Sequence, residues 1–174
     1  MAIYYGDGSN SNLGRVVRMV EVGYQSRWFV NSPSGSWHNG PGNLGSDTAC
    51  GIACAKAANK VLLTATLNMG GVNTWTQPTA RIITRQGTSG SWTTLYGGGQ
   101  ITYLSGRDGA HSTLCIKFLH HPNTTNNQYY KLQFTSMDSG NYLRLNYGDV
   151  NSGGDNQSDQ SPRSTLIAEE RSFT

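Results

Sequence analysis

The chain has little charge and no long apolar run. Only 13% of its 174 residues are Asp, Glu, Lys or Arg, too few for long solvated helices. The 13 basic and 10 acidic residues give a net charge of +3, and no run of Lys or Arg could neutralise successive phosphates. No stretch approaches the roughly 18 apolar residues that cross a bilayer. These absences argue against nucleic acid and against a membrane as partners.

Cysteine is equally scarce, because Cys50, Cys54 and Cys115 are the whole supply. Three thiols cannot all pair within one chain, and no charged-then-apolar signal pattern opens the sequence. We therefore expect a protein that does not use the general secretory route. A disulfide between Cys50 and Cys54 would require a helical or bent segment, since four extended residues hold the two Cα atoms too far apart.

Motifs for metal or catalytic chemistry are also missing. The three cysteines and the His120-His121 pair lack the closely spaced ligand pairs of a zinc site. The tract Gly148–Asp159 carries oxygen side chains suited to calcium but no closing Glu, and a solvated loop is the simpler interpretation. No nucleophile elbow, His-Glu-x-x-His or carboxylate pair among apolar neighbours is present. We expect no enzyme activity, no cofactor and no metal site.

The chain does contain short runs in which every second residue is apolar. The clearest occur between Ser112 and Tyr147, in the runs Leu114–Phe118, Tyr130–Phe134 and Leu143–Tyr147. A cluster of turn residues around Pro122 separates the first two runs. The short connection from Met137 to Gly140 predicts a tight hairpin that pairs the second run with the third.

Similar runs recur along the rest of the chain. Lys60–Asn68 predicts a central strand with one wholly apolar face, and Ala49–Lys60 has a helical composition but suits an extended segment equally well. Eight or nine short strands at this turn spacing predict an all-β antiparallel fold, a sandwich or a barrel, that occupies residues 15–174. The further strands are expected at Arg15–Val22, Ala80–Thr84, Trp92–Tyr96, Gln100–Leu104 and Ser164–Glu169.

Two regions outside this framework are candidates for contacts with partners. Residues 1–14 predict an extended N-terminal arm in which Ile3, Tyr4, Tyr5 and Asp7 dock onto another protein, with a frayed terminus as the alternative. Residues 23–58 predict a long surface excursion that contains two tryptophans. These are candidate contacts with a partner or a glycan, or they pin the loop to its own domain. The two are Trp28 and Trp37.

Four segments together resemble a family of small virion structural proteins of marine tailed bacteriophages, cyanophages especially. They are Met1–Val17, Lys60–Gly71, Cys115–Asn146 and Ser164–Glu170. The resemblance implies a β-sandwich behind a short aromatic leader, and we expect it to be antiparallel and jelly-roll-like. His120 and His121 depart from it, because an Asp-Ser pair is more usual in that turn.

The resemblance implies a non-enzymatic protein of the virion, made in the cytoplasm of a bacterial host. We expect a capsid decoration or vertex protein that forms a homotrimer and contacts other virion proteins. A short tail-fibre tip or adaptor is the alternative within this class. In another class, a carbohydrate-binding module would stack host surface glycans on Trp28, Trp37, Trp75 or Trp92. An enzyme such as a depolymerase would need an acidic pair in a cleft.

Overall fold

The structure, a computed structural model, describes residues 14–30, 35–71, 78–100, 111–136, 143–146 and 163–173. No helix in these ranges is long and apolar enough to cross a membrane. The ranges contain a short 3-10 helix, η1 (Gly42–Leu44), and eleven strands: β1 (Arg15–Tyr24), β2 (Trp28–Val30), β3 (His38–Asn39), β4 (Cys50–Ala53), β5 (Lys60–Gly71), β6 (Pro78–Gln86), β7 (Thr93–Gln100), β8 (His111–His120), β9 (Asn127–Ser136), β10 (Leu143–Leu145) and β11 (Ser164–Ser172).

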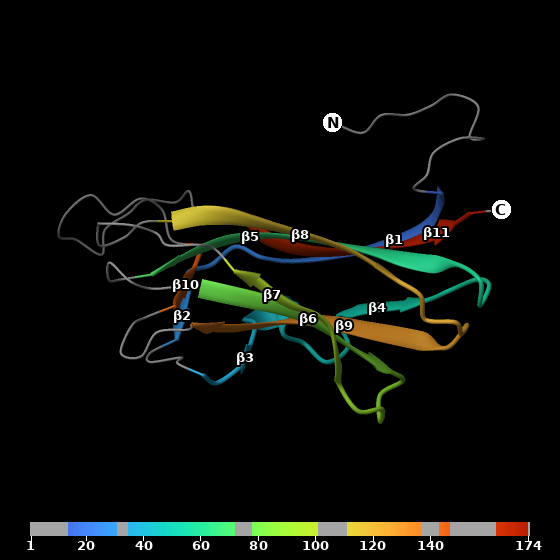
Figure 1. Cartoon of the computed structure of the whole chain (residues 1–174), viewed down its shortest axis with the longest axis horizontal. Coiled ribbons are helices and arrows are strands. Elements are labelled where there is room, and N and C mark those ends of the chain that lie inside the picture. Colours follow the sequence, from blue (N-terminus) through green and yellow to red (C-terminus); the bar gives the residue numbers. More distant parts are fainter. Residues whose placement is uncertain are drawn as a thin grey trace.

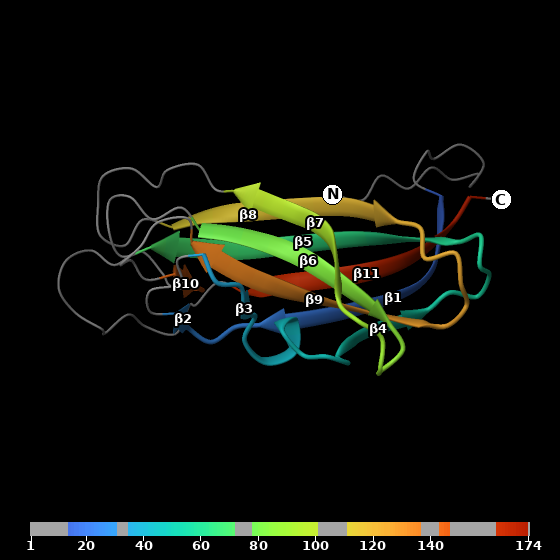
Figure 2. The same cartoon turned by 60° about the horizontal axis from the view of Figure 1, so that its bottom comes forward.

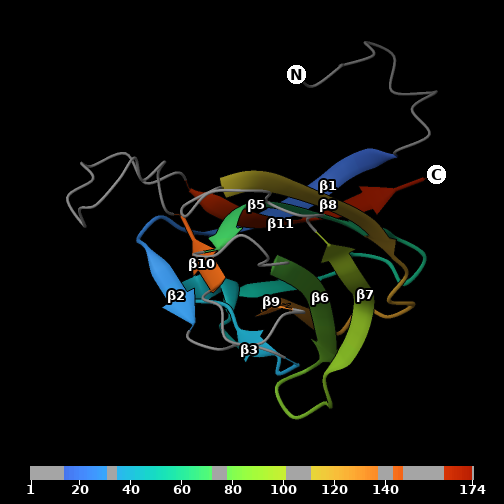
Figure 3. The same ribbon diagram turned by 60° about the vertical axis from the view of Figure 1, so that its left-hand side comes forward.

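The strands form two antiparallel sheets packed face to face (Figures 1 and 2). Sheet A has the order β1-β11-β5-β8, and β10 and β2 extend it beside the second half of β5. Sheet B has the order β9-β6-β7, with β3 and β4 both paired to the free edge of β9. Figure 3 shows β10 and β2 bending from sheet A toward the second layer. The predicted all-β sandwich is confirmed.

The strand pairs are nested in the way that defines a jelly roll. β6 pairs with β7 at the centre of the chain, β5 with β8 outside them, β4 with β9 next, and β1 with β11 outermost. Successive pairs alternate between the two sheets. A hairpin of eight strands folded over on itself gives this arrangement, which is the double-sheet jelly roll.

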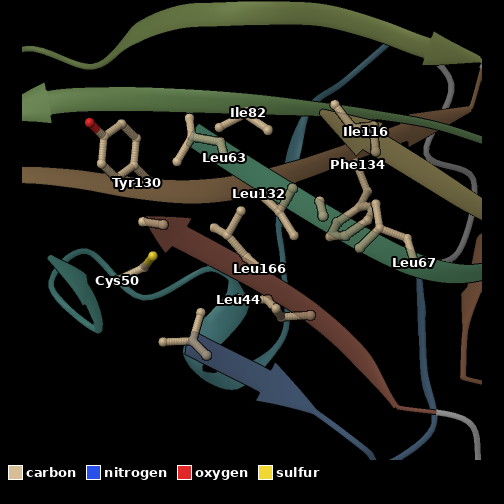
Figure 4. Packing of buried hydrophobic residues seen from close by; sticks show 14 of the residues in the cluster. Leu44, Cys50, Leu63, Leu67, Ile82, Ile116, Tyr130, Leu132, Phe134 and Leu166 are labelled. Carbon is tan, nitrogen blue, oxygen red and sulfur yellow. The ribbon is translucent and has the colours of Figure 1, made fainter. Parts of the chain in front are cut away.

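The core lies between the sheets and follows the predicted alternation. Val61, Leu63, Ala65 and Leu67 of β5 are fully buried, as expected for a central strand. Tyr130, Leu132 and Phe134 of β9 meet them from sheet B (Figure 4). From β1, Val22 is buried and Val20 packs against the same cluster, which identifies the inner face of that strand. Leu44 of η1 closes one side of the core.

The predicted hairpin between the second and third runs is wrong. β9 belongs to sheet B, whereas β10 belongs to sheet A and pairs with β5 and β2. Alternation gives β10 a buried face, through Leu143 and Leu145, but does not specify its neighbour. The Asn146 N–H donates to the Asn68 carbonyl and joins the end of β10 to β5.

The region from Gly23 to Ala58 is more regular than predicted. It contains β2, β3, η1 and β4, and these short elements complete the edges of both sheets. Cys50–Ala53 is extended as β4, so the helical alternative for Ala49–Lys60 is wrong there. Of the strand predicted at Gln100–Leu104, only Gln100 lies in the described ranges, as the last residue of β7.

Candidate functional site

The predicted docking residues fall outside the part of the chain that the structure describes. This holds for Ile3, Tyr4, Tyr5 and Asp7 of the arm, and for the possible calcium tract Gly148–Asp159. The arm therefore stays a prediction.

The two candidate tryptophans lie on opposite faces of sheet B. Trp28 packs against the core, with its ring centroid 5.7 Å from that of Phe134. Trp37 lies on the other side of sheet B, where the guanidinium carbon of Arg81 stands 4.1 Å from its ring centroid. Trp28 thus pins its loop to the domain, and Trp37 remains available for contact with a ligand.

The outer face of sheet B is largely covered, although it points away from the core. Side chains on this face alternate with the core residues of β6 and β9. Four of them are nevertheless only 3 to 5% exposed: Thr79, Ile83, Lys131 and Thr135. Asp47 and Trp92, from outside β6 and β9, contact this surface. A second packed layer therefore lies on sheet B.

At one end of this layer, Arg81 connects β6 to β9 and to Trp37. Its Nε and one terminal nitrogen donate to Oε1 of Gln133, at 2.9 and 2.6 Å. The Gln133 amide then donates to the side-chain oxygen of Asn39 on β3. Burial lowers the pKa of Arg81 from its ordinary value, but arginine stays protonated at physiological pH. The result is a fixed cation beneath an indole ring.

At the other end, Trp92 lies over two cations. Its ring centroid is 4.3 Å from Lys131 Nζ and 4.7 Å from the guanidinium carbon of Arg85. Asp47 accepts from Lys131 at 2.7 Å and lies 3.8 Å from Arg85. The hydrogen bond from Lys131 lowers the pKa of Asp47, and the charges of Lys131 and Arg85 act in the same direction. The carboxylate therefore stays ionised at neutral pH.

The outer face of sheet A carries an apolar row instead. The pairing register places Met19 of β1, Leu62 of β5 and Leu119 of β8 on one line across the sheet, with Glu169 of β11 between the first two. Met19 is 55% exposed and Leu119 is 37% exposed. Five of the six exposed large apolar side chains in the described ranges belong to this end of the sheet. We call them the sheet A patch: Val16, Val17, Met19, Leu119 and Phe173.

A buried carboxylate holds β1 and the neighbouring loop to sheet A. Glu170 of β11 is fully buried and accepts from the Asn59 amide and the Ala55 N–H, both at 2.6 Å. Arg18 of β1 pairs with it at 2.9 Å and also donates to the Ala53 carbonyl. Three segments distant in sequence meet at this one side chain, and it fixes the strand that carries most of the patch.

The thiols of Cys50 and Cys54 lie in the core, and neither is activated as a nucleophile. Cys50 and Cys54 are buried free thiols, and Cys115 is exposed on β8. Burial raises the pKa of Cys50 to about 12 and raises that of Cys54, so neither is a thiolate at neutral pH. The described residues contain no group of three His, Cys, Asp or Glu that could hold a metal. Cys50 and Cys54 act as small core side chains.

An open hollow of about 360 Å³ lies beside the β6–β7 turn. Its lining includes Arg85, Ser91, Gln128 and His120, and no carboxylate. His120 and Tyr130 are hydrogen-bonded at 3.0 Å, and burial lowers the pKa of the imidazole. The acidic pair that a depolymerase would need is absent from this lining.

No protein-family model and no curated protein matches the chain. Among solved structures, it is similar to a chain of the T=1 particles derived from infectious bursal virus, with 13% identity and a TM-score of 0.43 over 100% of this chain and 41% of that one. It is also similar to the VP2 subviral particle of infectious bursal disease virus, with 13% identity and a TM-score of 0.40 over 91% of this chain and 39% of that one.

A third similar structure contains the CBM22-1 and GH10 modules of a Clostridium thermocellum xylanase complexed with xylohexaose, with 6% identity and a TM-score of 0.37 over 94% of this chain and 28% of that one. The chain thus spans about two fifths or less of the chains it resembles. Similarities this distant select no function, and the fold assignment above rests on strand order and register.

Sequence reasoning named Trp92 only as one of four tryptophans that could stack on a sugar, and it missed the cations beneath the ring. Trp92 precedes a strand, while Arg81 and Arg85 are four residues apart on β6 and therefore share a face. That spacing was the available signal. The position of Lys131 beneath Trp92 depends on the pairing of β6 with β9, which no local pattern specifies.

Proposed function

We propose that this chain is a non-enzymatic structural protein of a virus particle, which assembles with copies of itself and with other virion proteins. The observation that carries the proposal is the sheet A patch on a jelly-roll sandwich. Viral capsid domains commonly use this fold, although fold alone does not specify function. A cluster of exposed apolar side chains indicates a contact surface.

The patch suits assembly because its apolar side chains do not stabilise the isolated chain while they face water, and a partner that covers them would gain their burial energy. Met19, Leu62 and Leu119 lie on a regular four-stranded surface, and β1 is the outermost strand of that sheet in the described ranges. The remaining details come from the sequence resemblance: a bacteriophage particle, a capsid decoration or vertex position, a homotrimer, and an N-terminal docking arm. A short tail-fibre tip or adaptor is the competing position on the particle.

The oligomeric state of the purified chain tests this proposal. We expect light scattering to give three times the 18.8 kDa chain mass. The double variant Met19→Gln and Leu119→Gln should be monomeric, because it removes apolar contact area without adding charge. Thr66→Gln, on the same outer face but outside the patch, is the matched control and should leave the mass unchanged.

A wild-type chain that stays monomeric at high concentration would contradict the proposal, and so would a double variant with unchanged mass. At a concentration low enough to keep all three proteins monomeric, circular dichroism should give the same melting temperature, since the substituted side chains are at the surface and assembly no longer stabilises the wild type. Antibody labelling of virions would then distinguish the capsid shell from the tail.

A further inference from the structure

A second surface lies on the opposite sheet and is chemically unlike the sheet A patch. We call it the Trp37–Trp92 surface, made of the two indoles and three cations on the outer face of sheet B. Arg81 and Arg85 are four residues apart on β6, so their backbones are separated by about 13 Å. The two indoles therefore mark the ends of an extended site rather than a single point. The members are Trp37, Arg81, Arg85, Trp92 and Lys131.

The indole of Trp92 is the outermost layer at its end of this surface. The side chains of Lys131 and Arg85 are only 5% and 11% exposed, whereas Trp92 is partly exposed. Because the cations lie close to the ring and are more buried than it is, they occupy its inner side. The partial exposure of Trp92 leaves part of the ring, away from these cations, open to solvent. Trp37 is likewise partly exposed over Arg81.

Flat aromatic faces directed to solvent suit the apolar face of a sugar ring, because an indole offers a large apolar area and little conformational entropy to lose. Such rings also stack on nucleic-acid bases, but those sites add a cationic groove that follows the phosphates. Here Lys131 is buried and paired with Asp47, and the chain carries a net charge of only +3. The chemistry favours a saccharide over a single strand.

The charge of the surface selects an acidic sugar. Three cations, Arg81, Arg85 and Lys131, accompany one carboxylate, Asp47. Arg81 gives two of its five N–H donors to Gln133, and its remaining donors can pair with a carboxylate through the planar fork of the guanidinium. That fork geometry matches a uronic acid and gives the arginine a function that a neutral glycan would leave unused.

We propose that the Trp37–Trp92 surface binds a uronic-acid-bearing polysaccharide. Sugar rings stack on the outer faces of Trp37 and Trp92, and a sugar carboxylate pairs with Arg81. This site lies on the sheet opposite the sheet A patch and does not rest on the proposed role in the virion. In a particle protein it would hold a host surface polysaccharide.

Titration with defined oligosaccharides tests the site in the full chain. We expect saturable quenching of tryptophan fluorescence by a hexagalacturonate, confirmed by calorimetry, and at least ten-fold weaker binding of a neutral hexasaccharide. Trp37→Ala and Arg81→Gln should each raise the dissociation constant at least ten-fold. Arg81→Lys, which keeps the charge but loses the fork, should also weaken binding.

Folding and assembly are controlled separately. Affinities are compared only among variants whose cooperative melting curves show that they are folded. Trp37→Phe, which keeps an aromatic face, should restore most of the affinity lost in Trp37→Ala. The Met19→Gln and Leu119→Gln double variant should bind the hexagalacturonate like wild type whether or not it assembles. If the chain binds hexagalacturonate but does not assemble, the saccharide site is supported and the proposed function is contradicted. If the chain assembles but does not bind hexagalacturonate, the proposed function is supported and the saccharide site is contradicted.

Several results would overturn the site. They are no saturable binding of hexagalacturonate, equal binding of the neutral hexasaccharide, or full affinity in folded Trp37→Ala and Arg81→Gln. Tighter binding of a sulfated oligosaccharide would replace the uronate with another anionic sugar. Tighter binding of oligothymidylate would make the surface a single-strand site instead.

Discussion

The two outer faces of the sandwich differ in how far their side chains are exposed, although the same alternating sequence pattern produces both. Both sheets direct every second side chain outward. On sheet A these side chains stay exposed, including the apolar Met19 and Leu119. On sheet B they are covered, so that even Lys131 is only 4% exposed. Alternation therefore separates core from exterior, but it does not say whether the exterior meets solvent, a partner or another part of the same chain.

This difference predicts which face stabilises the isolated chain. Side chains on sheet B already have their contacts, so removing them should weaken folding. Side chains in the sheet A patch have few contacts in the monomer, so removing them should weaken association. The following three experiments, which use four variants, test this division.

The largest effect is expected for Glu170→Ala, which breaks the link that presents the patch. It leaves the Ala55 N–H and the Asn59 amide without their buried acceptor and removes the partner of Arg18. Removing one member of a buried charged pair typically costs 3–5 kcal/mol, and because Arg18 is half exposed we expect about 3 kcal/mol. Urea unfolding measures the loss, and hydrogen exchange should show it first in β1. A loss below about 1 kcal/mol would mean that the network is dispensable.

A direct comparison of the faces comes from Trp92→Ala and Met19→Ala. Trp92→Ala uncovers Lys131 and removes both cation contacts, so we expect it to cost about 2 kcal/mol. Met19→Ala removes an exposed side chain and should stay within about 0.5 kcal/mol of wild type. Both values come from urea unfolding of monomeric protein at low concentration. Equal losses would erase the proposed division between the faces.

The smallest effect expected on sheet B should depend on pH. The pKa of Asp47 is lowered in the folded chain from its ordinary 3.8, so its pairing with Lys131 stabilises the fold above that pH and is lost as the pH falls through the folded value. Asp47 is 54% exposed, so Asp47→Asn should cost at most about 1 kcal/mol at pH 6. The gap between variant and wild type should shrink toward pH 3. A gap that is constant or grows on acidification would contradict the assignment.

The sequence was enough to predict the sandwich but not to predict which strands are neighbours in each sheet. Alternation predicted the buried faces of β5, β8 and β9 because burial repeats every second residue along a strand. It could not predict that β10 pairs with β5, since any strand with an apolar face could occupy that edge. The three-residue and two-residue strands β2 and β3 are too short to show any period.

The candidate sites were less predictable for a related reason. Trp37 was identified from its type and its place in a loop, and the structure puts it on the outer face of sheet B. Trp92 was named as the start of a strand and as one of four tryptophans that could stack on a sugar, but its position could not be predicted because its partner Lys131 is 39 residues away in sequence. The patch could not be foreseen at all: β1 shows Val16, Val17 and Val20 in one run, and only tertiary packing decides which are covered.

The nested pairing also determines the order in which strand pairs can form as the chain is synthesised. β6 and β7 are near neighbours in sequence and can meet early, whereas β1 must wait for β11, whose partner residues Arg15 and Ser172 stand at opposite ends of the described chain. Contacts between distant segments form slowly because the loop entropy is lost first. A ribosome must therefore deliver Ser164–Ser172 before β1 has its neighbour. Unfinished chains therefore lack the complete outer face of sheet A, and the edge of β5 that β11 covers stays unpaired until synthesis has passed Ser172.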